Sequence, residues 1–193
     1  MAREIGIISI CEALSHATDF ISEALFEKAT LMTFAHDGLR DSLTHLAAPP
    51  YFYENLRREL ITADRNKSRL TLIRFQLFAQ TDLVDPPAES FSQGNHLRSR
   101  DSLYEVAILS FAEFLKSVTR AEDLCARLGQ LEFTLILKGA HEVGEHLSQR
   151  VITGWKMDSF SCQSALVSAQ RGESSLEILN RLDNQELRGT SPR

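Results

Sequence analysis

Apolar side chains recur at a three-or-four-residue spacing along much of the chain, which is the pattern of helices with one buried face. This spacing predicts helices at about 7–35, 51–66, 101–119, 141–155 and 174–188. The second helix follows Pro49–Pro50. Proline is tolerated in the first turn of a helix and interrupts the secondary structure before it. The helix at 7–35 is amphipathic, so it either packs on its own domain or serves as a dimerisation or partner helix.

Shorter apolar runs, rich in β-branched and aromatic residues, lie between these helices and predict strands. They are found at 69–79, at 160–169 and, as two strands around a turn at Gly129–Gln130, within 123–137. The segment 80–100 is polar and contains two adjacent prolines, which predicts a long loop. The resulting order β-α-β-β-α-β predicts an α+β fold in which helices flank a mostly antiparallel sheet.

Composition narrows the class of protein without naming a function. A chain of 193 residues suits one domain plus an extension, and its net charge of −5 argues against a nucleic-acid partner. The three cysteines, Cys11, Cys125 and Cys162, are far apart, so we expect reduced thiols in a cytoplasmic protein and no zinc site. The sequence has neither the pattern of a signal peptide nor an apolar run long enough for a membrane span.

Two motifs carry a resemblance to a known family. The segment 41–52, DSLTHLAAPPYF, is similar to the pattern D-x-L-T-G-L-x-N-R-x-x-F, with His45 in place of the glycine. The segment 126–133, ARLGQLEF, is similar to the hairpin signature A-R-x-G-G-D-E-F, with Gln130 and Leu131 as departures. With the intervening strand and helices in matching order, the chain resembles the GGDEF family of diguanylate cyclases.

The resemblance implies a fold and a domain organisation. It covers residues 41–188, which leaves an N-terminal helical extension at 1–40 and a disordered tail at 189–193. It implies the ferredoxin-like core of nucleotidyl cyclases, in agreement with the element order predicted above.

The resemblance also implies a reaction for which this chain lacks the residues. Cyclases of the family join two GTP molecules across a dimer of domains, and each half-site holds divalent metal with carboxylates. The D-x-D positions of the family correspond here to Gln76 and Phe78, and the third signature position corresponds to Leu131. Glu132 remains, but one carboxylate cannot rebuild a two-metal site. We therefore expect no catalytic residue, no metal and no enzyme activity.

The guanine-binding region of the family corresponds to 91–100, where Phe91 replaces the base-binding asparagine and Arg100 replaces an aspartate. A shifted register could still supply a carboxylate from Asp82 or Asp85. Such a shift would not restore the carboxylate lost at Leu131.

A second family motif, the inhibitory product site R-x-x-D, is retained. It comprises Arg120 and Asp123, separated from Gly129 by five residues as in the family. The resemblance implies cyclic di-GMP as the ligand: an arginine fork can pair with guanine or phosphate, and a carboxylate can accept from the guanine N–H groups. Arg150 corresponds to a further family arginine, one residue off the family spacing. The alternative is that Arg120 and Asp123 form only a surface ion pair.

The sequence leaves three hypotheses about function. In the first, the chain is a cytoplasmic receptor that binds cyclic di-GMP through Arg120, Asp123 and Arg150 and has no cofactor. It would signal to protein partners through the N-terminal helix or the 80–100 loop, and could form a homodimer. The second hypothesis is an interaction scaffold that binds no nucleotide. The third, an active cyclase, is disfavoured by the lost carboxylates.

Overall fold

The computed structural model describes residues 37–80 and 93–189, with side chains described from Ser102 onward in the second range. The helix expected at 7–35, and most of the loop expected at 80–100, lie outside these residues. Within the described ranges, no helix combines the length and apolarity needed to cross a membrane.

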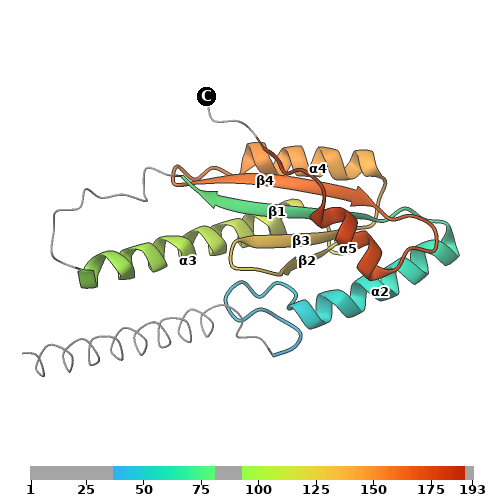
Figure 1. Ribbon diagram of the computed structural model, residues 1–193, viewed down its shortest axis with the longest axis horizontal. Helices are drawn as coiled ribbons and strands as arrows, with labels where there is room; N and C mark the ends of the chain where they lie inside the picture. The colour runs from blue at the N-terminus through green and yellow to red at the C-terminus, as the bar shows by residue number, and fades with distance from the viewer. Residues whose placement is uncertain (1–36, 81–92, 190–193) are drawn as a thin grey trace, which may run out of the picture. The chain divides into compact units, whose positions relative to one another are not determined.

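The described residues form an open sheet of five strands, in the order β2-β3-β1-β4-β5 (Figure 1). The strands are β1 (Thr71–Ala79), β2 (Leu124–Arg127), β3 (Glu132–Leu137), β4 (Phe160–Ser168) and β5 (Arg188–Gly189). Each neighbouring pair is antiparallel. The α+β fold and the antiparallel sheet expected from the sequence are therefore confirmed.

Four helices cover the two faces of this sheet: α2 (Pro49–Asn66), α3 (Gln93–Val118), α4 (His141–Gly154) and α5 (Ser175–Asp183). Side chains alternate between the faces along each strand. On β1, Ile73 and Phe75 join a core cluster with α3 and α4, whereas Leu72 joins a second cluster with α2 and α5. The sheet is thus buried on both faces, and only its ends and edges are left for binding.

Phe111 of α3 lies at the centre of the first core cluster. Its ring centroid is 5.8 Å from that of Phe75, 4.8 Å from that of Phe133 and 5.2 Å from that of Trp155. Such tilted and edge-to-face contacts stabilise a core beyond the area that they bury. Phe133, the last position of the family signature, is therefore a core residue in this chain.

The structure corrects the expected start of α3. The helix begins at Gln93, not at Asp101, so the polar residues 93–100 are helical and the predicted loop is shorter. Extending an existing helix adds one hydrogen bond for each residue that is fixed. A polar segment without an apolar stripe can therefore continue a helix that the apolar residues after it have established.

The C-terminal helix is also shorter than expected, since α5 ends at Asp183 and not near residue 188. Arg188 and Gly189 pair instead with Ser164 and Gln163 at the edge of β4. A Cβ on Gly189 would lie 2.7 Å from Gln163 Cγ, so glycine allows this close approach. Gly189, which we assigned to the disordered tail, therefore belongs to the sheet.

Residues 37–48 are tied to the sheet by a buried ion pair. Arg127 Nη1 lies 3.3 Å from Asp41 Oδ1, and the two side chains are 3% and 6% exposed. Asp41 Oδ2 also accepts from the Thr44 N–H at 2.8 Å and from the Thr44 hydroxyl at 2.7 Å. Beside the pair, the Ala47 N–H donates to Cys125 O at 3.0 Å, which closes the free edge of β2. This pair joins the two segments that carry the family resemblance.

Arg127→Ala is expected to lower the free energy of unfolding by about 3–5 kcal/mol, because it leaves the Asp41 carboxylate buried without its charge partner. Urea denaturation followed by circular dichroism measures the change. Arg57→Ala, in an exposed pair with Glu54, is the control and should change stability little. The double variant Asp41→Asn, Arg127→Met should be more stable than the sum of its single variants predicts. Additive losses would show that the pair is not coupled.

Candidate functional site

The strand ends that correspond to the cyclase centre lie together in the structure. Gln76 of β1 lies directly opposite Glu132 of β3, and the Leu77 N–H donates to Leu131 O at 2.9 Å. The Leu131 side chain packs against the first core cluster, and Phe78 is 39% exposed. Across the described ranges, no group of three or more His, Cys, Asp or Glu side chains is placed to hold a metal ion.

A fixed positive charge stands beside Glu132. Arg74 of β1 pairs with Asp183 of α5 at 2.9 Å, and its Nε is buried without a hydrogen-bond partner among the described residues. Burial raises the pKa of Glu132, and Asp183 adds to this rise, whereas Arg74 opposes it. Sequence analysis missed Arg74, although a lone arginine within an apolar strand is a signal that could have identified it.

The hairpin turn keeps its form although its signature has changed. The backbone N–H groups of Leu128 and Gly129 both donate to Glu132 O, at 3.1 and 3.3 Å. A Cβ on Gly129 would lie 3.1 Å from Glu132 Cβ, so glycine is favoured at this position. Arg127 donates to Gln130 O at 3.2 Å and so fixes the other side of the turn. The turn therefore depends on backbone contacts and not on the side chains of Gln130 and Leu131.

The residues of the R-x-x-D motif form a tight turn between α3 and β2, here called the Arg120 turn (residues 119–123). Asp123 accepts from the backbone N–H groups of Arg120 and Lys138, both at 3.2 Å, and its own N–H donates to Arg120 O. The Arg120 side chain is 67% exposed, and its guanidinium lies 3.8 Å from Glu122. The carboxylate is therefore held by the backbone, while the guanidinium faces solvent.

The structure brings Arg150 to the same end of α3. Its Nη2 donates to the Val118 carbonyl at 2.6 Å, two residues before Arg120. A cation at this position also satisfies a free carbonyl at the end of a helix. The three residues predicted from the sequence thus lie in one region, and each also has a local structural contact.

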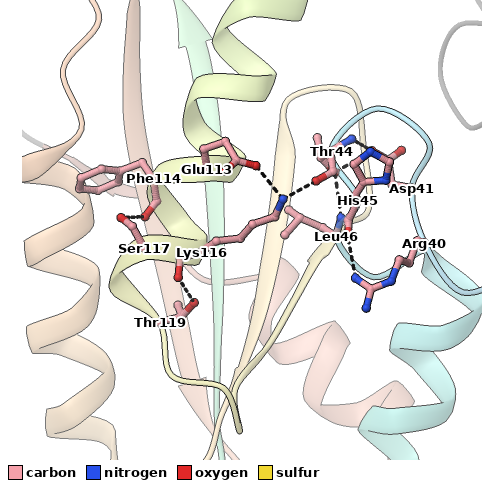
Figure 2. Close-up of polar contacts among 10 residues, drawn as sticks. All are labelled: Arg40, Asp41, Thr44, His45, Leu46, Glu113, Phe114, Lys116, Ser117 and Thr119. Atoms are coloured by element: carbon pink, nitrogen blue, oxygen red, sulfur yellow. Dashed lines mark hydrogen bonds and ion pairs between the residues drawn. The ribbon is translucent and has the colours of Figure 1, made fainter.

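A groove of about 620 Å³ adjoins the Arg120 turn, and Arg150 is not among the residues that line it. Its walls come from residues 39–51, from the end of α3 and from the Arg120 turn, and we call it the Arg120 groove. Figure 2 shows Lys116 reaching from α3 to the Thr44 carbonyl, at 2.8 Å, with Glu113 as its ion-pair partner. In the same view, Arg40 donates to the His45 carbonyl at 2.8 Å. Sequence analysis missed this groove.

His45, which stands where the family pattern has glycine, adopts a left-handed backbone with φ of 57°. Only a few per cent of residues other than glycine do so, and asparagine, aspartate and histidine are enriched among them. Its carbonyl accepts from Arg40 and its N–H donates to Asp41 O at 2.9 Å. The turn after Asp41 therefore places a histidine in a conformation that glycine adopts readily.

Two of the three cysteines lie in the described residues, and both are free thiols. Burial raises the pKa of Cys125 to about 11 and that of Cys162 to about 12. Both thiols therefore stay protonated at neutral pH, which makes them poor nucleophiles and poor metal ligands.

No family model matches the sequence, and no curated protein sequence does. Solved structures match. The GGDEF domain of DgcB from Caulobacter crescentus, in complex with c-di-GMP, gives a TM-score of 0.61 at 19% identity, over 77% of this chain and 85% of that chain. Diguanylate cyclase SiaD from Pseudomonas aeruginosa, in complex with its activator SiaC, gives a TM-score of 0.61 at 20% identity, over 95% of this chain and 69% of that chain. The FimX GGDEF domain from the same species gives a TM-score of 0.59 at 15% identity, over 76% of this chain and 90% of that chain.

The chain therefore has the fold of a GGDEF domain, as the resemblance implied. In this fold the Arg120 turn precedes the edge strand β2, and the signature hairpin (residues 126–133) joins β2 to β3. Two separate regions are thus candidates for function: the strand ends at Gln76 and Glu132, and the surroundings of the Arg120 turn.

Glu132→Gln is expected to raise the free energy of unfolding at pH 7. The raised pKa means that the ionised carboxylate costs stability in the folded state, and glutamine removes that charge. The gain should shrink as the pH falls through the raised pKa, because Glu132 then becomes neutral in the wild type. Urea denaturation at several pH values measures it, with Glu105→Gln on the exposed face of α3 as the control. A variant that is less stable at pH 7 would contradict this account.

Proposed function

We propose that this chain is a catalytically inactive GGDEF-type domain that acts as a cyclic di-GMP receptor in signal transduction. The observation that carries the proposal is the Arg120 turn, in which the backbone fixes Asp123 while the Arg120 guanidinium is exposed. A site that is ordered before binding loses less entropy when the ligand arrives. The c-di-GMP complex of the DgcB GGDEF domain supports the choice of ligand.

The chemistry of the turn suits a guanine nucleotide. The planar Arg120 fork can donate two parallel hydrogen bonds to guanine O6 and N7, or to phosphate oxygens. Asp123 already accepts two backbone hydrogen bonds, and an ionised carboxylate has about four acceptor positions, so it can also accept from guanine N1 and N2. Arg150, near the end of α3, would add a second cation.

Loss of catalysis is part of the same proposal. Phosphoryl transfer between two GTP molecules needs divalent metal held by hard oxygen ligands. At the corresponding strand ends this chain has Gln76, Phe78 and Leu131, and Arg74 pairs with Asp183 beside the remaining Glu132. The residues present do not fit a two-metal centre.

The output of such a receptor would be a change in protein contacts. The Arg120 groove is bounded in part by residues 39–47, which follow the predicted N-terminal helix in the sequence, so ligand at the turn would act on this connecting segment. The complex of SiaD with its activator SiaC supports a protein partner as one route. We therefore propose signalling through the N-terminal helix or the 80–100 loop in the cytoplasm.

A nucleotide-free interaction scaffold is the second candidate function. The observation that favours it is that Asp123 and Arg150 are each already used to stabilise the turn and the end of α3. Affinity for cyclic di-GMP separates the two functions.

Isothermal titration of cyclic di-GMP into the unaltered chain should show binding, and Arg120→Ala should weaken it by about 2 kcal/mol or more, roughly 30-fold. The loss is expected because the substitution removes the guanidinium and leaves the turn intact. Arg58→Ala is a matched control, since Arg58 is also 67% exposed but lies on α2. Absence of binding by the unaltered chain would reject the receptor and leave the scaffold.

Incubation of the chain with GTP and Mg²⁺ should yield no cyclic di-GMP, because Gln76 and Leu131 cannot bind the metal ions. Chromatography of the reaction mixture, with an active cyclase run in parallel, measures product. The double variant Gln76→Asp, Leu131→Asp tests whether the fold still tolerates carboxylates at these positions. Product from the unaltered chain would overturn the assignment as inactive.

A further inference from the structure

The Arg120 groove is a second binding surface that adjoins the Arg120 turn. Arg120 and Asp123 line it, but Arg150 does not, so it extends from the turn in a direction away from α4. Its opposite wall is formed by Arg40 and Tyr51. At about 620 Å³, the groove lies in the size range of sites for small organic ligands.

Cations outnumber carboxylates among the side chains that line the groove, although the chain as a whole has a net charge of −5. Arg40, Lys116 and Arg120 line it, against the single carboxylate of Asp123. Arg40 and Lys116 are each tethered to a backbone carbonyl of the turn after Asp41, at 2.8 Å, which restricts where their charges can lie (Figure 2). Glu113 and Glu122 balance part of this charge from outside the lining. The groove therefore favours an anion over a cation.

The same groove is also lined by exposed apolar and aromatic side chains. Tyr51 lies in the first turn of α2 and is 39% exposed, and the neighbouring Leu39 is also exposed. An aromatic face beside fixed cations is the combination that binds a base together with its phosphate. A simple inorganic anion would use the cations but not the tyrosine.

We infer that the ligand bound at the Arg120 turn extends into this groove, with a phosphate beside Arg40 and Lys116 and a base stacked on Tyr51. This inference rests on the proposed function and adds a specific contact to it. A single domain then holds both halves of the cyclic dinucleotide, without an arginine from a second copy. Tyr51 and Arg40 are the residues that distinguish this mode from binding by the turn alone.

The test is isothermal titration of cyclic di-GMP into four variants of the full chain. Tyr51→Ala should weaken binding by about tenfold, because it removes a stacking contact, whereas Tyr51→Phe should retain affinity. Tyr53→Ala is the matched control, since Tyr53 lies on the same helix and is 47% exposed but is not part of the groove. Arg40→Gln removes the positive charge, so binding should weaken several-fold and depend less on salt.

The outcomes separate the inference from the function on which it rests. If Arg120→Ala abolishes binding while Tyr51→Ala and Arg40→Gln bind like Tyr53→Ala, the receptor stands and the groove is overturned as part of its site. If the unaltered chain does not bind cyclic di-GMP, both are overturned. We also expect one ligand to bind each monomeric chain. The same titration measures this stoichiometry, and light scattering measures the oligomeric state. Binding that requires a dimer would contradict the inference.

Discussion

Asp41 and Arg127 form a buried ion pair, and the conformation of much of the proposed binding region depends on this pair. An unpaired buried ion costs several kcal/mol, so each partner needs both the other ion and additional hydrogen bonds. Asp41 obtains them from Thr44, and Arg127 from Gln130 O. The ion pair thereby fixes the turn after Asp41, the signature hairpin and the edge of β2 relative to one another. Both walls of the Arg120 groove are attached to these three segments.

Several positions where this chain matches the GGDEF pattern have structural roles. Phe52 and Phe133 are fully buried, Leu46 is nearly so, and Asp41 belongs to the buried ion pair. The departures at Gln76 and Phe78 lie where β1 reaches the hairpin, outside the centre of the core. A metal site at the end of a sheet is not needed to pack the sheet, so the fold does not require carboxylates at these positions.

The proposed ligand site and the proposed route to partners are continuous in the fold. The Arg120 turn connects α3 to β2, and Lys116, in the last turn of α3, contacts the Thr44 carbonyl. A ligand that moves the Arg120 turn would therefore act on the turn after Asp41 as well. His45 adopts a left-handed backbone conformation in that turn.

The sequence by itself determined the elements whose signals are local. The apolar run of β1, the hairpin around Gly129 and the strand at Glu132–Leu137 were predicted within two residues, because side-chain character and turn chemistry act over short distances. The end of α5 and the existence of β5 were not predicted. Two residues form a strand only when an edge such as that of β4 is available to pair with them.

Tertiary structure decided which charges meet. Asp41 and Arg127 are 86 residues apart, Lys116 and Thr44 are 72 apart, and Arg74 and Asp183 are 109 apart. Local sequence does not indicate such a partner, because a charged residue looks the same in the sequence whether its charge is solvated by water or paired with a buried ion. The retained R-x-x-D motif could be found from spacing alone. The groove beside it could not, because its walls exist only once the sheet has brought residues 39–51 against the end of α3.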